Sequence, residues 1–251
     1  DLPLCTATGW GGAATGGLLP VMGGYCEAPW DQRITEIEPN SNYVFSHIRN
    51  DSLIASDHHV DETVTFNQDD FPYLTAELGG GVQVTKHRRP IVSGNDVGAM
   101  SLTKLGSGVG LLGYYMYHGG SNPDSKLSTL QESRATGYLN DLPEINYDFN
   151  APIRQYGTIS DNYREIRLLA YFLQDFGADL AVLPADIDPD FVKPGDTHTL
   201  RVSVRHDDTH GYIFVNNYQR RLTMDDHKDV VLKGKTKGEP VCFPKTDIAS
   251  G

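Results

Sequence analysis

The chain has 251 residues, of which 39% are hydrophobic and 22% are charged, values close to those of ordinary globular proteins. Its 33 acidic and 21 basic residues give a formal net charge of −12, which argues against nucleic acid and anionic membranes as partners because phosphates repel an acidic surface. No apolar run approaches the roughly 18 residues that a membrane-spanning helix needs, and three cysteines without metal-ligand spacing (Cys5, Cys26 and Cys242) are interpreted as structural thiols.

The segment over residues 71–77 is a short apolar run bounded by turn residues, and it is predicted to form a buried strand. It ends in one carboxylate, Glu77, and three glycines follow Leu78 and leave room for a ligand to approach the backbone. A carboxylate at the carboxyl end of such a strand stands where barrel enzymes keep their chemistry. An exposed acid in a flexible loop is the alternative interpretation.

A second buried strand is predicted over residues 109–117, and it ends in a polar turn, His118-Gly-Gly-Ser-Asn122. The intervening residues 93–105 have helical spacing, with Val97 and Met100 on one side. Strand, helix and strand in this order make a βαβ unit, whose parallel pairing brings both strand ends to the same face.

The last third of the chain begins with one more predicted helix. Ser160 suits the N-cap of this helix, and Gly177 suits the C′ position just beyond its end. From residue 184 turn residues lead into an alternation in which Val202 and Val204 are separated by polar side chains, as in a half-buried strand. A turn and a second strand follow, so residues 184–251 are expected to be all-β.

Five segments follow one another along the chain: Thr6-Ala-Thr-Gly-Trp10, Gly23-Gly-Tyr-Cys-Glu-Ala-Pro-Trp30, Thr75-Ala-Glu77-Leu-Gly-Gly-Gly81, Gly113-Tyr-Tyr-Met-Tyr-His118-Gly-Gly-Ser-Asn122 and Tyr147-Asp-Phe-Asn-Ala-Pro152. Together, and in this order, they resemble the family 35 glycoside hydrolases, the β-galactosidases, in their bacterial branch. The resemblance runs through essentially the whole chain.

The resemblance implies an α/β fold, the C-terminal portion of a (β/α)8 TIM barrel followed by an all-β module. Residues 1–183 are then expected to hold the last three βα units, with barrel strands over residues 2–8, 71–77 and 109–117. Residues 184–251 are expected to begin a β-sandwich-like domain. Such barrels have eight strands and usually about 250 residues, but only the last three strands are expected here, so the chain is interpreted as a fragment of a longer enzyme.

The family's chemistry needs two carboxylates, which lie about 5–5.5 Å apart in a retaining glycosidase. The resemblance implies that Glu77 is the nucleophile and that the acid/base lies on a barrel strand outside this chain. Glu27 and Glu132 are interpreted instead as surface or loop acids. The expected function is hydrolysis of terminal non-reducing β-D-galactosyl residues, without a cofactor, by a full-length enzyme of which this chain alone is expected to be inactive.

Five further residues are expected by the same resemblance to bind the substrate. Tyr115, like Tyr117, leaves its strand at the mouth of the barrel and could hydrogen-bond the sugar or the nucleophile, although one of the two could simply pack. Tyr147 belongs to the matching Tyr-Asp-Phe segment and is expected to bind the substrate. His118 and Asn122 could contact sugar hydroxyls, although their turn could serve only to position the loop. Phe149 stands where the family often has tyrosine, so only an apolar ring face remains for the sugar. The expected partner is a β-galactoside oligosaccharide or glycoconjugate, and neither a nucleic acid nor a membrane.

Two other classes of protein stay open. Asp57-His58-His59 resembles the signature of certain metal-dependent phosphoesterases, but His87, His118 and His206 lack matching acidic partners at strand ends, so a solvated loop and no metal site are favoured. A non-catalytic sugar-binding remnant is the second alternative, in which Trp10 and Trp30 could stack on sugar rings unless they are buried. Such a module has no need of a carboxylate like Glu77.

Overall fold

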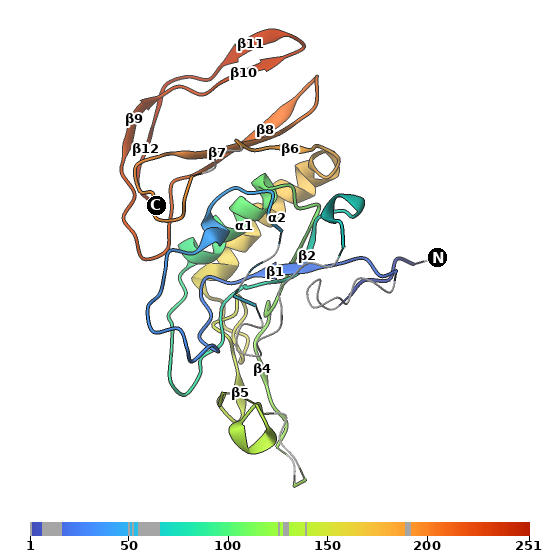
Figure 1. The fold of residues 1–251 in the computed structure, drawn as a ribbon, viewed down its shortest axis with the longest axis vertical. Helices are drawn as coiled ribbons and strands as arrows, with labels where there is room; N and C mark the ends of the chain where they lie inside the picture. Colours follow the sequence, from blue (N-terminus) through green and yellow to red (C-terminus); the bar gives the residue numbers. More distant parts are fainter. Residues whose placement is uncertain are drawn as a thin grey trace.

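The computed structural model describes residues 2–6, 17–49, 51, 53–54, 66–124, 126–127, 131–138, 140–188 and 192–251. Strands β1 (Met22–Gly24), β2 (Leu74–Leu78) and β3 (Leu111–Tyr114) form a parallel sheet in that order. Helix α1 (Gly94–Gly106) connects β2 to β3, and helix α2 (Asp161–Leu180) packs beside α1 (Figure 1).

The remaining strands pair antiparallel. Two of them form an arm at the far end of the molecule from the chain's C-terminus, β4 (Gly120–Ser121) and β5 (Asn146–Tyr147) (Figure 1). A three-stranded sheet contains β6 (Ala185–Asp186), β7 (Arg201–His206) and β8 (Gly211–Asn216). Beyond it lie two pairs, β9 (His227–Val230) with β12 (Thr246–Ile248) and β10 (Lys233–Thr236) with β11 (Glu239–Cys242). Short 3-10 helices span Ser41–Tyr43, Gln68–Asp70 and Arg134–Thr136.

The expected fold class is wrong. The described residues contain two α-helices and five small sheets, four of them antiparallel, so the chain is mostly β and is not a portion of a TIM barrel. The strand expected over residues 2–8 is also wrong in its described part, where Cys5 makes a single bridge to Leu19 and Met22–Gly24 lies beside β2 instead. The parallel βαβ unit from β2 to β3 is confirmed. Its local pattern does not specify how many further strands join it.

Helix α1 begins at a capping box. Ser93 accepts a hydrogen bond from the backbone N–H of Asp96, and the Asp96 carboxylate accepts in return from the backbone N–H of Ser93, so two otherwise unpaired donors are satisfied. The inner side of the helix is buried through Val97 and Met100, as its spacing predicts. This helix therefore connects two directly paired parallel strands, β2 and β3, and covers their sheet with its buried side.

Helix α2 begins where it was predicted but ends later. Ser160 precedes it, yet the serine hydroxyl donates to the carbonyls of Ala151 and Pro152 and does not cap the helix. Gly177 lies within the helix, which continues to Leu180, so the predicted C′ position is wrong. A Cβ atom at Gly177 would meet only ordinary contacts at 3.5 and 3.7 Å with Leu173, and nothing there requires a glycine.

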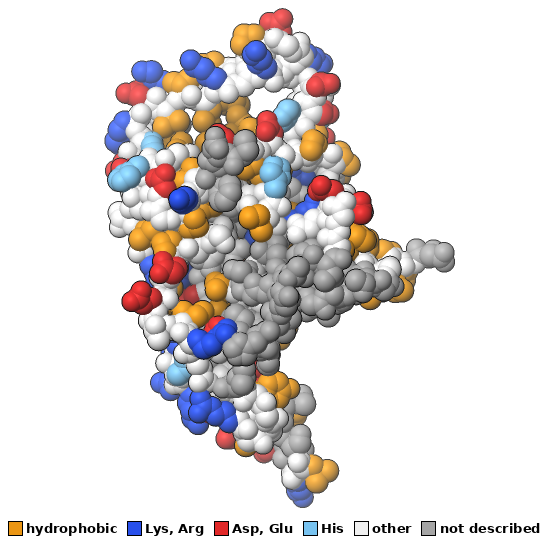
Figure 2. All heavy atoms as spheres, in the orientation of Figure 1, with side chains coloured by type: hydrophobic (Ala, Val, Ile, Leu, Met, Phe, Trp, Pro, Cys, Tyr) orange, Lys and Arg blue, Asp and Glu red, His pale blue; other side chains and the backbone are white. Residues whose placement is uncertain are grey.

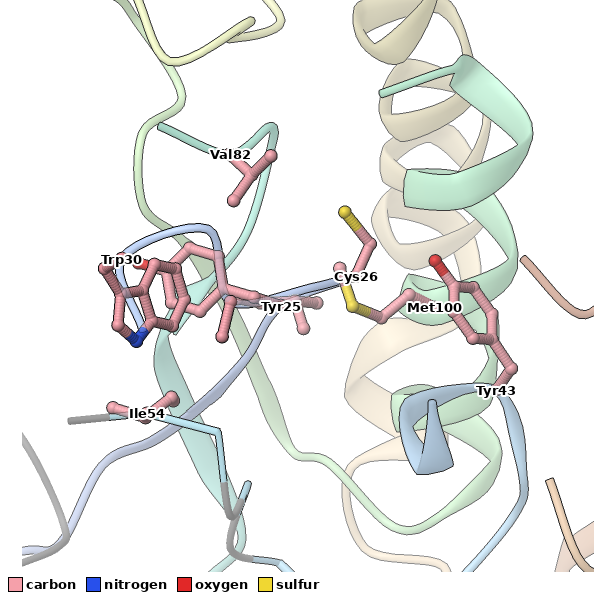
Figure 3. Close-up of a cluster of buried hydrophobic side chains, with 9 residues drawn as sticks. Tyr25, Cys26, Trp30, Tyr43, Ile54, Val82 and Met100 are labelled. Carbon is pink, nitrogen blue, oxygen red and sulfur yellow. The ribbon is translucent and has the colours of Figure 1, made fainter. Parts of the chain in front are cut away.

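The main core lies between the parallel sheet and α1. Figure 3 shows Met100 of the helix beside Cys26 and Tyr43, and the rings of Tyr25 and Trp30 together on the sheet side. The Cys26 thiol is buried and unpaired, and burial raises its pKa to about 12, so it is a structural thiol. On the face seen in Figure 2, acidic and basic side chains are interspersed over the end of the molecule built by β9–β12.

Strand β7 alternates as predicted, but the face that it buries is the polar one. Arg201, Ser203 and Arg205 are buried, whereas Val202 and Val204 are only half-buried. The reason is the length and donor number of arginine, whose guanidinium group can reach carbonyls that would otherwise stay unpaired.

Strands β7 and β8 form an antiparallel hairpin. The buried face of β7 joins this hairpin to α1 and to the parallel sheet. Arg205 donates to the carbonyl of Leu105 at the end of α1, where helical carbonyls lack partners, and to that of Val109 between α1 and β3. Ser203 donates to the carbonyl of Gly106 at the same place. The division predicted between residues 183 and 184 stays a prediction, and these contacts cross it.

Candidate active site

Glu77 lies near the carboxyl end of β2, and its side chain is half-buried. Its neighbour across the sheet is Gly23 of β1. A Cβ atom at Gly23 would come within 2.6 Å of the backbone oxygen of Glu77 and 3.1 Å of its Cβ atom. A larger residue there would push β1 and β2 apart at Glu77, so the glycine allows β1 to lie close against this position.

Among the described residues, one side chain donates a hydrogen bond to the Glu77 carboxylate, that of Tyr25 just beyond β1. The Tyr25 hydroxyl donates to Oε1 of Glu77 over 2.8 Å. Burial raises the pKa of Glu77, and the charge of Asp51 adds to the rise, while the Tyr25 hydrogen bond opposes it; the net direction is upward. Burial and the negative charge of Glu77 also raise the pKa of Tyr25, so this phenol stays protonated and can only donate to the carboxylate.

Three aromatic side chains predicted to bind substrate form one group near Glu77. The hydroxyl oxygens of Tyr115 and Tyr147 lie 2.8 Å apart, and the Phe149 ring is 5.6 Å from that of Tyr115 and 4.7 Å from that of Tyr147. The pKa of Tyr147 is raised by burial first, then by the Tyr115 hydrogen bond, with a further contribution from the charge of Glu77. Glu77 and this aromatic group are therefore within electrostatic range of each other.

The three glycines after Leu78 have a packing role. A Cβ atom would lie 2.7 Å from the Tyr25 ring at Gly79, 2.5 Å from the backbone oxygen of Met116 at Gly80, and 2.1 Å from that of Phe149 at Gly81. Protein atoms thus occupy the space that the sequence suggested for a ligand. The glycines instead let the chain around residues 115–117 and 149–150 approach β2, which brings the aromatic group to Glu77.

His118 and Asn122 contact backbone groups of the chain around the β4–β5 arm. Asn122 donates from its side chain to the carbonyl of Glu144 over 3.0 Å, and its backbone N–H bonds to Ile145, so it stabilises the β4–β5 arm. The exposed His118 ring is in close contact with the carbonyl of Gly119. Among the described residues neither side chain has a contact with Glu77, and their assignment to substrate binding stays a prediction.

Glu27 lies in a loop, as one part of its interpretation states, but it is not a surface acid. Its side chain is only 2% exposed, and its Oε2 accepts from Arg220 and Arg221 at 2.7 and 2.9 Å. Burial alone would raise the pKa of Glu27, but these two hydrogen bonds and charges lower it overall. Glu27 is thus a carboxylate fixed in an ion pair and unsuited to donate a proton at neutral pH. Glu132 lies within electrostatic range of Tyr147, because its charge contributes to the raised pKa of that tyrosine.

Trp30 is buried as a structural residue. It donates from its ring nitrogen to the carbonyl of Leu53 over 3.1 Å and packs edge-on against Tyr25 at 5.0 Å. Trp10 and the Asp57-His58-His59 segment lie outside the described residues. Within the described residues, no three His, Cys, Asp or Glu side chains are grouped so as to hold a metal ion.

Comparison of the sequence with models of known protein families gives no match, and comparison with curated proteins gives none either. Neither of the two described α-helices is both long and apolar enough to cross a membrane. The candidate site therefore stands on the geometry around Glu77.

Tyr25 is the site residue that sequence reasoning missed. The sequence places it inside the Gly23–Trp30 segment, directly after a glycine pair that looks like a turn. A signal was nevertheless present, because a glycine pair beside a tyrosine can mark a strand that closely approaches another backbone. The register of β1 against β2, which brings Tyr25 level with the end of β2, could not be read from the sequence.

Proposed function

We propose that this chain supplies the nucleophile of a retaining β-galactosidase and that the nucleophile is Glu77. The observation that carries the proposal is the hydrogen bond from Tyr25 to Glu77 at the end of a parallel strand, next to the aromatic group of Tyr115, Tyr147 and Phe149. Ligands of parallel sheets bind beyond the carboxyl ends of the strands, which is where this carboxylate lies.

The proposed reaction is a double displacement. Glu77 attacks the anomeric carbon, the bond to the leaving oxygen breaks, and a galactosyl ester forms on the carboxylate. Water then hydrolyses the ester and releases galactose. A proton donor assists the first step and takes a proton from water in the second. We assign this acid/base to a residue outside the chain, since Glu27 is held ionised by two arginines.

The hydrogen bond from Tyr25 supports the nucleophilic role. An attacking carboxylate has to be ionised, and burial works against ionisation at this position. A phenol that donates to Oε1 stabilises the ionised form and fixes the direction of the other oxygen. The aromatic group supports a sugar as the ligand, because a pyranose ring has an apolar C–H face that packs on aromatic rings while tyrosine hydroxyls bind its edges. The choice of galactose rests on the resemblance of the five sequence segments.

The test is covalent trapping by a deoxyfluoro-galactoside that carries a dinitrophenolate leaving group. This leaving group departs without protonation, so the reaction does not require the acid/base and the chain can be used as it is. We expect slow stoichiometric labelling, with the label on the peptide that contains β2, and turnover of ordinary β-galactosides below detection.

The control is the matched deoxyfluoro-glucoside, which should label far more slowly if the site is specific for galactose. A label on Glu27 or Glu132 would show that the nucleophile is misassigned. A galactoside that binds saturably to the unmodified protein without ever labelling it would favour the alternative, a sugar-binding protein without catalysis.

A further inference from the structure

A hollow of about 610 Å³ lies at the amino ends of the parallel strands, at the opposite end of β2 from Glu77. It is lined by Tyr73 just before β2, by Gly110 just before β3, and by the residues that follow α2. Two arginines, Arg49 and Arg205, also line it. Nothing in the proposed glycosidase chemistry uses this hollow.

Arg205 is only 1% exposed, yet some N–H donors of its guanidinium group have no acceptor among the described residues. Its Nε atom donates to the carbonyl of Leu183 over 3.0 Å, and both N–H groups of Nη1 are used by Leu105 and Val109. Arginine has five N–H donors, so the two on Nη2 remain. Among the described residues no acceptor is bonded to Nη2.

The charge of Arg205 is also unbalanced. In the described part of the chain no carboxylate forms an ion pair with it, and its pKa is lowered by burial alone. Arg220 offers a contrast, since Glu27 and Asp96 pair with it. Arg201 offers another, because carbonyl and amide oxygens accept from both of its terminal nitrogens. A buried guanidinium without a counter-ion is costly, and an anion that reaches it offsets that cost.

Arg49 adds a second cation to the wall of the hollow. Its Nη1 donates to the carbonyls of Gln68 and Phe71, and its guanidinium group stacks over the Tyr73 ring at 5.4 Å. These contacts hold the group in place and leave Nε and Nη2 without acceptors among the described residues. The opposing charge is Asp69, whose side chain is exposed. The hollow is therefore locally cationic on a chain with a net charge of −12.

We propose that this hollow binds a small oxyanion, a carboxylate or a phosphate group, between Arg205 and Arg49. A planar guanidinium fork matches the oxygens of both groups, and a buried hydrogen bond between ions is stronger than one between neutral groups. The site is separate from Glu77, so the proposal stands or falls independently of the galactosidase proposal.

The test is a titration of the isotope-labelled protein with inorganic phosphate, and in parallel with acetate, at ionic strength held constant by sodium chloride. We expect saturable shifts of the Arg205 Nε–H resonance and of the Gly110 amide, with saturation below about 50 mM. The probe that binds more tightly shows whether the hollow prefers a phosphate or a carboxylate group. No saturable shift with either probe, or an equal shift with chloride alone, would overturn the proposal.

A matched pair of variants gives the second measurement. A Cβ atom at Gly110 would come no closer than 3.9 Å to any other atom, so a small side chain fits there without disturbing the arginine's carbonyl contacts. Gly110→Asp places a carboxylate in the hollow and should abolish the response to phosphate, whereas Gly110→Asn should keep it. Arg49→Gln should weaken phosphate binding by about tenfold. Phosphate shifts that persist unchanged in Gly110→Asp and in Arg49→Gln would show that the anion binds elsewhere.

Discussion

Glu77 and Glu27 are two carboxylates partly or fully shielded from solvent. Tyr25, which donates to Glu77, lies only two residues before Glu27 in the chain, yet the environments of the two carboxylates are opposite. Within the part of the chain that the structure describes, Glu77 has a single donor, the neutral Tyr25 hydroxyl, and its pKa is raised. Glu27 is more deeply buried, yet its pKa is lowered because Arg220 and Arg221 donate to it. Burial alone therefore does not decide the ionisation of a carboxylate; the charge and number of its donors do. Under our proposal Glu77 is the reacting carboxylate, whereas Glu27 pairs with arginines and holds the fold together.

The largest expected effect is on the labelling rate and comes from replacing Glu77, the proposed nucleophile. Glu77→Gln keeps the size of the side chain and an acceptor for Tyr25 but removes the attacking charge. We expect labelling by the activated fluoro-sugar to fall on the order of 10³-fold or more. The same variant removes a carboxylate that burial disfavours, so its free energy of unfolding should rise by roughly 0.5–2 kcal/mol at neutral pH. Denaturant unfolding checks the second point, and lower stability would contradict our account of the Glu77 environment.

On the structural side, Arg220→Met removes the partner shared by Glu27 and Asp96. Both carboxylates are almost fully buried, and we expect a loss of about 3 kcal/mol in the free energy of unfolding. The contribution of Glu27 to stability is present above the ordinary carboxyl pKa and is lost as the pH falls through its lowered pKa. The difference in stability between wild type and variant should therefore shrink in acid, and urea unfolding across that range measures it.

Tyr25→Phe tests whether the phenol sets the ionisation of Glu77. The Tyr25 hydrogen bond lowers the pKa of Glu77 against the effect of burial, so its loss should raise that pKa further. A smaller fraction of Glu77 is then ionised at any given acidic pH, and the acidic limb of the labelling rate should move to higher pH, with a penalty of about 1 kcal/mol in the barrier. Tyr147→Phe, which leaves Oε1 of Glu77 bonded, is the matched control. An unmoved pH profile would show that Tyr25 only packs.

The smallest expected effect comes from Arg221, whose side chain also bonds Glu27 but is 49% exposed. Water screens this pair, and Arg221→Gln should cost no more than about 0.5 kcal/mol in the free energy of unfolding. A loss as large as that of the Arg220 variant would show that donor number outweighs burial of the donor. Equilibrium denaturation of the two variants under the same conditions makes the comparison.

The sequence predicted the elements that hold the site better than the architecture around them. The strand that ends at Glu77 and the helix after it were predicted because apolar runs and helical spacing are local signals. The barrel was not a safe inference, since a βαβ unit has the same local pattern in many folds. Strand β7 illustrates a second limit, because alternation gives the period of a strand but not the face that is buried. Arg201 and Arg205 occupy that face through carbonyls that are distant in sequence.

The buried arginines of β7 also bear on how the molecule comes apart. Removing the hairpin would strip partners from the last carbonyls of α1 and from that of Tyr43 in one step. Such shared hydrogen bonds couple segments into one cooperative unit, which opens and closes together. We therefore expect the amides of β2, α1 and β7 to exchange with deuterium at a common, slow rate, although β2 and β7 are separated by more than 100 residues of chain. Markedly faster exchange of β7 would show that the hairpin is an independent appendage.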